Sequence, residues 1–145
     1  MFWDKVAVVY DIFVNVINRK THQRLKEIVS ELIEPEDTVL ECACGTGLLS
    51  AVIAPRCRQL TATDFSVKML KRAEKNGSSC RNITYALADV TALSYPDGSF
   101  DKVVAGNVIH LLDNPLTALR ESISNRNAVK QEMILLDGIA LIPSI

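Results

Sequence analysis

One short stretch of the sequence, Leu40 to Ser50 (LECACGTGLLS), holds residues that could bind a ligand. Gly45 and Gly47 are typical of a tight turn from a strand into a helix, where backbone N–H groups face a ligand. Glu41 comes just before that turn, and its negative charge would repel a phosphate bound there. The stretch therefore predicts a ligand that is not held at this turn by a phosphate.

Three more polar residues stand at the ends of predicted strands. Asp64 ends QLTATD, Asp89 ends ITYALAD and Asn107 ends FDKVVAGN. The carboxyl ends of parallel strands meet at one edge of a sheet, where ligands bind. One carboxylate can accept hydrogen bonds from two ribose hydroxyls, which suits Asp64, and another can accept from an adenine amino group, which suits Asp89. We expect a nucleoside ligand with a cationic amino-acid portion.

The elements that position these residues follow from the hydrophobic pattern. Helical spacing of apolar residues predicts two helices within residues 1–34. Residues 37–145 then alternate strands with helices, in the order DTVLECA, LLSAVIAP, QLTATD, FSVKMLKRAEKNG, ITYALAD and FDKVVAGN, with a helix starting near Asn114 and Pro115. This alternation predicts an α/β domain with a Rossmann-like, doubly wound, mostly parallel sheet and helices on both faces.

Composition limits the class of protein. The chain has 145 residues, 48% hydrophobic and 23% charged, with a net charge of −1, which predicts one globular domain over residues 1–145. That charge balance argues against a nucleic-acid surface and favours a small-molecule partner. The four cysteines form no C-x-x-C pair or Cys/His cluster, so we expect no metal, reduced thiols and a cytoplasmic setting. No apolar run reaches the length of about 18 residues that predicts a membrane span.

Three segments together carry a resemblance to a known family. VLECACGTGLLS, TATDFSVKML and ALADVTALSYPDGSFDKVVAGNVIHLL resemble the class I S-adenosylmethionine-dependent methyltransferases. The likeness is greatest to the small-molecule type related to ubiquinone and menaquinone biosynthesis methyltransferases, and it runs from Tyr10 to Leu119. The resemblance implies S-adenosylmethionine as cofactor, S-adenosylhomocysteine as product and a small-molecule methyl acceptor. Oxygen, nitrogen, carbon, sulfur and arsenic acceptors are all compatible with the sequence.

The resemblance also implies a role for individual residues. The methionine portion of the cofactor would lie at Glu41, Ala43, Gly45 and Gly47, with Ala43 in place of the family's first glycine. The adenosine portion and the remaining contacts would involve Asp64 at the ribose, Phe65 and Met69 beside the adenosine, Asp89 and Val90 at the adenine edge, Asn107 near the methionine end, and Tyr10 in a covering helix. Because S-adenosylmethionine carries a sulfonium and an ammonium, Glu41 would attract it directly or through water.

Several of these residues have a purely structural alternative. Gly45 and Gly47 could only form a turn, Asp64 could only cap a helix beginning at Phe65 or Ser66, and Phe65 and Met69 could belong to the core. His110 follows the fourth strand and could act as a general base. A base is needed only when the acceptor must lose a proton, and a packed or surface histidine is the commoner outcome.

The C-terminal part departs from the family pattern. After the Asp137-Gly138 turn the sequence has one apolar run, IALIPSI, which predicts a fifth and last strand, so that the family's strands six and seven would be missing. An unpaired edge would invite self-association through residues 139–142. Missing acceptor-site parts leave open a domain that binds the cofactor without turnover. A nicotinamide-dependent oxidoreductase using Gly45, Gly47, Ser50 and Asp64 is disfavoured by Glu41 and leaves Asp89 without a role.

Overall fold

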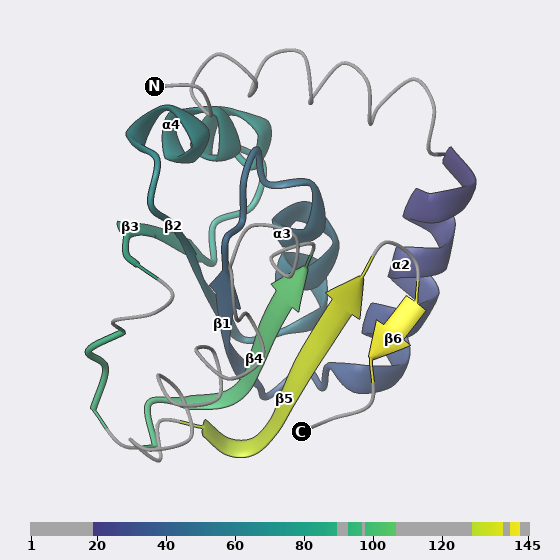
Figure 1. Ribbon diagram of the computed structural model, residues 1–145. Coiled ribbons are helices and arrows are strands. Elements are labelled where there is room, and N and C mark those ends of the chain that lie inside the picture. Colours follow the sequence, from purple (N-terminus) through teal and green to yellow (C-terminus); the bar gives the residue numbers. More distant parts are fainter. Residues whose placement is uncertain (1–18, 90–92, 97, 107–128, 138–139, 143–145) are drawn as a thin grey trace.

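The computed structural model describes residues 19–89, 93–96, 98–106, 129–137 and 140–142 (Figure 1). Helix α2 (Arg19–Leu32) leads into a six-stranded sheet in the order β3-β2-β1-β4-β5-β6. The strands and the helices between them are β1 (Thr38–Cys42), α3 (Leu48–Ile53), the 3-10 helix η1 (Ala54–Arg56), β2 (Gln59–Asp64), α4 (Val67–Asn76), β3 (Ile83–Leu87), β4 (Phe100–Gly106), β5 (Val129–Asp137) and β6 (Ala140–Ile142). Strands β1 to β5 are parallel, so the predicted Rossmann-like, mostly parallel sheet is confirmed. The first predicted helix lies outside the described residues.

The predicted number of strands and the position of the fifth strand were wrong. Strand β5 is VKQEMILLD, which runs parallel to β4. The apolar run that we expected as the fifth strand contains β6. Strand β6 pairs antiparallel with β5, and Ala140 lies opposite Asp137. Two antiparallel strands can follow each other through a two-residue turn, whereas a parallel strand needs a long crossover. The edge of the sheet on this side is therefore β6.

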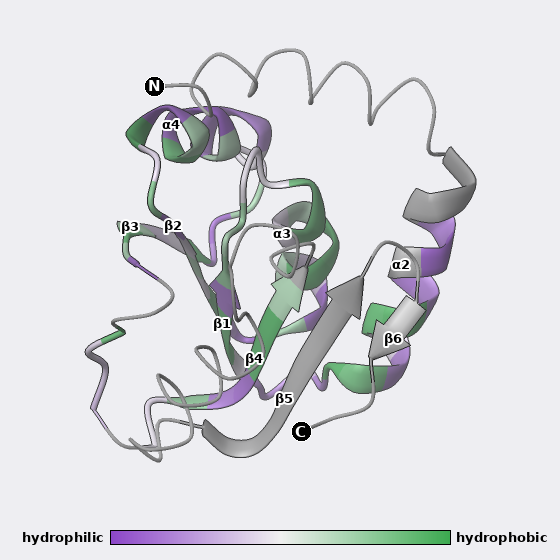
Figure 2. Cartoon of the chain, in the orientation of Figure 1, coloured by the Kyte–Doolittle hydropathy of each residue, from purple (hydrophilic) through white to green (hydrophobic). Residues whose placement is uncertain are grey.

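The three described helices lie on one face of the sheet. Both crossovers, β1-α3-β2 and β2-α4-β3, move in the same direction along the sheet, which places their helices on the same face. Helix α3 contacts both α2 and α4. Figure 2 shows α3 as mostly hydrophobic, while α2 and α4 carry hydrophilic residues as well. The main core under these helices consists of Ile28, Val29, Ile33, Val39, Val52, Ile53, Ala54, Cys57, Leu60 and Val104. Burial of this apolar surface is what holds the helices to the sheet.

The opposite face of the sheet has its own hydrophobic cluster. Leu93 packs there against side chains of β1 and β4, and the rings of Tyr95 and Phe100 meet edge to face at 5.0 Å. The helix expected near Asn114 lies outside the described residues, so helices on both faces remain a prediction for that part. Alternation of side chains along β1 explains the two cores, because Val39 faces the helices while Leu40 and Cys42 face the other way.

Helix α4 begins after a serine that acts as its N-cap. Ser66 is the N-cap, and its Oγ accepts a hydrogen bond from the backbone N–H of Met69 at 3.3 Å. Asp64 is not the N-cap, as one alternative had it; it accepts instead from the N–H of Ser66 at 2.9 Å. Gly77 ends the helix as predicted. The other predicted stop, Pro55, lies within η1 directly after α3.

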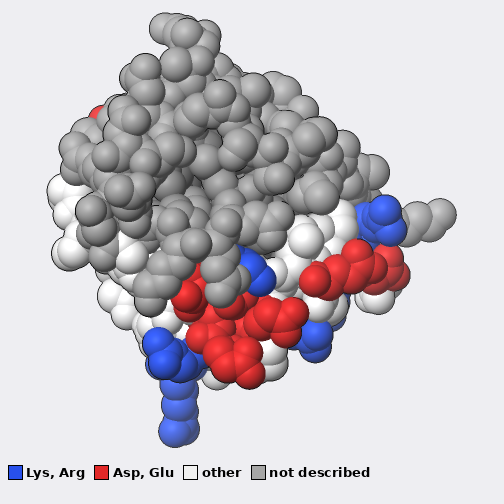
Figure 3. Space-filling view, turned by 90° about the horizontal axis from the view of Figure 1, so that it is seen from below, with Lys and Arg blue, Asp and Glu red and all other residues white. Residues whose placement is uncertain are grey.

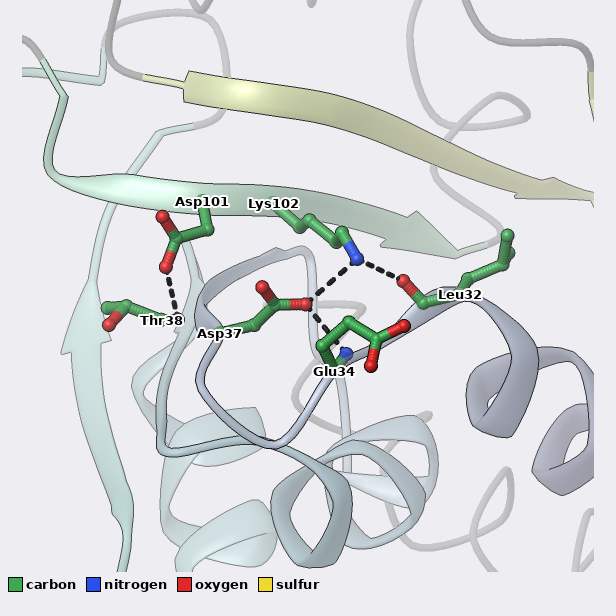
Figure 4. Close-up of polar contacts among 6 residues, drawn as sticks. All are labelled: Leu32, Glu34, Asp37, Thr38, Asp101 and Lys102. Atoms are coloured by element: carbon green, nitrogen blue, oxygen red, sulfur yellow. Dashed lines mark hydrogen bonds and ion pairs between the residues drawn. The ribbon is translucent and has the colours of Figure 1, made fainter.

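A buried ion pair joins α2, β1 and β4 at the amino ends of the strands. Lys102 Nζ lies 2.9 Å from Asp37 Oδ2 and also donates to the carbonyl of Leu32, while the N–H of Glu34 donates to the same Asp37 oxygen at 2.8 Å (Figure 4). Only 7% and 5% of the Lys102 and Asp37 side chains are exposed.

Asp101 also ties β4 to β1, because its carboxylate accepts from the N–H of Thr38 at 2.9 Å. Asp101 and Lys102 therefore both have structural roles. At this end of the sheet, acidic and basic side chains lie beside one another on the surface (Figure 3). The ion pair itself lies beneath, where it fixes the start of β1 against β4.

Gly47→Ala is expected to lower the free energy of unfolding by about 1–3 kcal/mol more than Gly45→Ala does, which is the usual cost of overpacking. Both glycines have positive φ, 84° and 57°, so both substitutions carry left-handed strain. A Cβ on Gly47 would lie 3.1 Å from Cα and Cβ of Ala73, whereas a Cβ on Gly45 would meet nothing within 4 Å. Urea unfolding of both variants measures the difference. Equal losses would contradict the close approach of the turn to α4.

Candidate functional site

The glycine-bearing turn after β1 is held in place by its neighbours. The N–H of Cys44 donates to the carbonyl of Thr63 on β2 at 2.8 Å, and the N–H of Gly47 donates to the carbonyl of Cys44 at 3.0 Å. Ala43 adopts φ 55°, in the left-handed region that glycine occupies without strain. The backbone thus turns sharply at three positions, Ala43, Gly45 and Gly47, which are the positions that the sequence singled out.

Asp64 connects this turn to the start of α4. Its Oδ2 accepts from the N–H of Gly45 at 2.9 Å, and its Oδ1 accepts from the N–H of Ser66 at 2.9 Å. Only 5% of the residue is exposed. Each carboxylate oxygen has two lone pairs, so this arrangement leaves Asp64 able to accept two further hydrogen bonds.

Glu41 lies at the end of β1 with its side chain directed toward α3. Its Oε1 accepts from the hydroxyl of Ser50 at 2.5 Å, and only 2% of the residue is exposed. Burial raises the pKa of Glu41 to about 8, the hydrogen bond from Ser50 lowers it, and the charge of Asp64 raises it. Burial therefore favours the protonated form of the Glu41 carboxyl.

The open part of the turn is at Gly45. A Cβ built there would meet nothing within 4 Å, although the N–H of the same residue is tied to Asp64. Phe65, 44% exposed, directly follows Asp64, while Met69 is buried on α4. The N–H of Ala88 donates to the carbonyl of Asp64 at 2.9 Å, which places the exposed Asp89 beside the same strand end.

The structure therefore gathers part of the predicted site. Eight of the predicted residues lie in the turn, at the carboxyl ends of β1 to β3 or at the start of α4: Glu41, Ala43, Gly45, Gly47, Asp64, Phe65, Met69 and Asp89. The strand order reverses between β1 and β4, the position where ligands bind in open α/β sheets. Tyr10, Val90, Asn107 and His110 lie outside the described residues, and their roles remain predictions.

Ser50 is the site residue that sequence reasoning missed. It had entered only as the small residue of a dinucleotide fingerprint, whereas the structure places its buried hydroxyl on Glu41. The sequence feature that could have indicated this contact is the short separation between the end of β1 and the first turn of α3. A tight turn brings those two positions together, and a buried carboxyl needs a donor.

Three of the four cysteines, Cys42, Cys44 and Cys57, are buried free thiols. Burial raises the pKa of Cys42 to about 12 and that of Cys57 to about 11, and burial also raises the pKa of Cys44. Among the residues that the structure describes, no three His, Cys, Asp or Glu side chains are placed to hold a metal ion.

Comparison with known proteins gives the family. The methyltransferase-domain family matches residues 40–123, which include the turn, Asp64 and Asp89. The chain belongs to the class I S-adenosylmethionine-dependent methyltransferases. The resemblance seen in the sequence is therefore confirmed, and the Rossmann-like fold agrees with it.

Two relatives show how far this methyltransferase likeness extends along the chain. The ubiquinone/menaquinone biosynthesis C-methyltransferase of Bdellovibrio bacteriovorus is 33% identical over 149 residues, covering 97% of this chain and 62% of the relative. The demethylmenaquinone methyltransferase of Renibacterium salmoninarum is 31% identical over 121 residues, covering 82% of this chain and 50% of the relative. The chain thus spans between half and two thirds of the length of these relatives.

A solved structure agrees with the fold of this methyltransferase chain. Phosphoethanolamine N-methyltransferase 1 of Haemonchus contortus, solved with phosphoethanolamine and S-adenosylhomocysteine, has a TM-score of 0.74 and 20% identity. The superposition covers 92% of this chain and 30% of that protein. Within the described ranges, no helix is long and apolar enough to cross a membrane.

Proposed function

We propose that this chain binds S-adenosylmethionine at the turn after β1 and transfers its methyl group to a small-molecule acceptor. The observation that carries the proposal is the turn itself: Gly45 opens onto free space beside Asp64, at the strand ends of a methyltransferase-family sheet. Relatives named for demethylmenaquinone and for ubiquinone/menaquinone biosynthesis support a small-molecule acceptor. The cytoplasm is the proposed location, and nucleic acid is not a proposed partner.

The cofactor has parts that match the residues of the turn and the strand ends. The ribose hydroxyls would donate to the free lone pairs of Asp64, and the adenine amino group would donate to Asp89. Glu41 would face the cationic methionine portion, whose charge favours the ionised form of a carboxyl. For the remaining contacts we propose Ala43 and Gly47 in the turn, Tyr10 in a covering helix, Phe65 and Met69 beside the adenosine, Val90 at the adenine edge, and Asn107 near the methionine end.

Transfer requires alignment more than acid or base chemistry. When bound, S-adenosylmethionine would supply an electrophilic methyl group on its sulfonium, and the carbon–sulfur electron pair would stay on sulfur in the product S-adenosylhomocysteine. The protein's part is to hold donor and acceptor in line, which can supply most of the rate. His110 would take a proton only from an acceptor that must lose one.

The edge strand β6 suggests a further property. Its outer side has no neighbouring strand among the described elements, and such edges pair readily with another chain. We propose that two copies associate along Ala140–Ile142. Sedimentation equilibrium should then show a dimer at tens of micromolar protein. A monomer across that range would contradict this proposal and leave cofactor binding unaffected.

Calorimetric titration with S-adenosylmethionine, S-adenosylhomocysteine and NAD tests the proposed site. We expect both adenosyl ligands to bind and NAD not to bind. Asp64→Ala should abolish binding, while Asp101→Ala, which removes a carboxylate bonded to a backbone N–H at the opposite end of the sheet, should not. A folded chain that binds neither adenosyl ligand would overturn the proposal. Binding without turnover across an acceptor panel would support the alternative of a cofactor-binding domain.

Gly45→Ala is expected to weaken binding of S-adenosylmethionine by at least about tenfold, because its methyl group would enter the open space beside Asp64. Gly98→Ala is the matched control, since Gly98 also has positive φ, 70°, but lies just before β4 at the far end of the sheet. Both variants should lose similar stability through backbone strain. Unchanged affinity in Gly45→Ala would place the cofactor elsewhere.

A further inference from the structure

The pair formed by Glu41 and Ser50 lies directly beneath the turn proposed to bind the cofactor. Ser50 is completely buried in the first turn of α3, and its hydroxyl donates to Glu41 Oε1 at 2.5 Å. Glu41 is 2% exposed at the end of β1. A buried carboxyl costs much free energy when ionised, and a single hydroxyl donor does not offset that cost.

The surroundings of Glu41 also favour the neutral form. From β2, Asp64 adds a second negative group, and its two oxygens accept from two backbone N–H groups. The titratable groups nearby are thiols and a phenol: Cys42 on β1, Cys44 in the turn and Tyr85 on β3. Burial is the main cause that raises their pKa values, and the charge of Glu41 raises them further.

The helix and the fourth strand contribute no charge at this point. Residues 48–53 of α3 are uncharged, and Val104 of β4 lies in register with Glu41. The groups that shift the pKa of Glu41, after burial, are the Ser50 hydroxyl and the Asp64 carboxylate. The nearest charged residue on β4, Lys102, is engaged with Asp37 at the other end of the strand.

We propose that Ser50 is a positioning residue of the cofactor site: it holds the Glu41 carboxyl, and binding of the cationic cofactor drives the proton of that carboxyl into the solvent. The inference rests on the proposed function, because it requires S-adenosylmethionine at the turn. The ammonium and sulfonium of the cofactor would bring positive charge close to Glu41. They favour the ionised carboxylate, and the Ser50 hydroxyl continues to donate to it.

Two measurable consequences follow for the wild-type chain. Binding at about pH 7 should release close to one proton, because the pKa of Glu41 is raised to about 8 before binding and falls on binding. Affinity should increase as pH rises toward 8 and then level off. The sign is fixed by the proton count: a proton lost on binding makes binding stronger at higher pH.

Calorimetric titration with S-adenosylmethionine in buffers of different ionisation enthalpy measures the released protons. Glu41→Gln should release close to none and show no rise in affinity with pH. Ser50→Ala removes a donor to the carboxylate, so the profile of affinity against pH should shift to higher pH. Affinity near neutral pH should then fall about tenfold, which is the change that one unit of pKa shift produces. Ser50→Thr should restore the profile. Ser30→Ala, at an exposed serine of α2 whose hydroxyl donates to the Lys26 carbonyl, is the matched control.

The outcomes separate this inference from the proposed function. Thermal melts first establish that each variant is folded. No binding by the wild type would overturn the proposed function and this inference with it. Binding with equal proton release in wild type and Glu41→Gln would overturn the inference alone, since the ligand's own ammonium contributes equally to both. A less stable Ser50→Ala with an unchanged pH profile would make Ser50 a structural residue only.

Discussion

Lys102→Ala is expected to lower the free energy of unfolding by about 3–5 kcal/mol, the usual cost of removing one partner of a buried ion pair. The substitution leaves Asp37, which is 5% exposed, without the cation that lies 2.9 Å away. It also removes the donor to the Leu32 carbonyl, at the end of α2. Urea unfolding monitored by circular dichroism measures the loss.

Two further variants serve as comparisons for the loss of stability in Lys102→Ala. Lys68→Ala removes an exposed lysine of α4 and should change stability by less than about 0.5 kcal/mol. The double variant Asp37→Ala with Lys102→Ala should lose less than the sum of the two single variants, because neither charge is then left buried alone. A Lys102→Ala chain as stable as Lys68→Ala would contradict the buried pair. The pair lies at the amino ends of the strands, so cofactor affinity should be unchanged.

The elements that the sequence predicted well are those with a simple local pattern. Short apolar runs with an acid at or near their end marked β1 and β2, and Gly77 marked the end of α4. Strand β5 was missed because its first half, Lys130 to Glu132, is polar and interrupts the apolar pattern on which the prediction depended. The apolar run after it was then taken for the fifth strand.

Long-range polar contacts could not be predicted in the same way. Lys102 and Asp37 are far apart in the sequence, and nothing local distinguishes this pair from two solvated charges. Parallel pairing of β1 with β4 brings them together, and only burial makes the pair strong. The same holds for the Asp101 carboxylate on the N–H of Thr38.

The candidate site was predictable at the level of residue types and strand ends. Glu41, Gly45 and Asp64 come together because they lie at or just beyond the carboxyl ends of β1 and β2, and parallel strands end at the same edge. The internal connections were not predictable. Asp64 holds the turn through two backbone N–H groups, and Glu41 turns inward to Ser50. Those connections depend on the path of the turn, which the sequence alone does not define.

The inward position of Glu41 predicts how the stability of the cofactor-free chain depends on pH. Burial raises the pKa of Glu41 to about 8 in the folded chain from the model-peptide value of 4.5, so the folded state holds a proton that the unfolded state has lost between these values. Stability from this group is fully present below pH 4.5. The free energy of unfolding should fall by about 1.4 kcal/mol per pH unit up to about pH 8 and then level off.

Glu41→Gln isolates this contribution because glutamine has the same shape and keeps an oxygen to accept from Ser50. At about pH 5 the two chains should be similarly stable, since both side chains are neutral there. At about pH 8 the variant should be more stable by several kcal/mol, because it has no buried charge to create. Urea unfolding across this range, with each chain free of cofactor, measures the difference between the two slopes.

A cationic cofactor should reduce the stability advantage of Glu41→Gln. Saturating S-adenosylmethionine stabilises a folded chain by mass action, and the gain grows with affinity. The wild type binds through an ionised Glu41 and the variant through a neutral amide, so the advantage of Glu41→Gln at about pH 8 should shrink or disappear when the cofactor is present. Parallel slopes in the cofactor-free chains would mean that Glu41 is ionised in the fold, and its inward hydrogen bond from Ser50 would then be made to an ionised carboxylate.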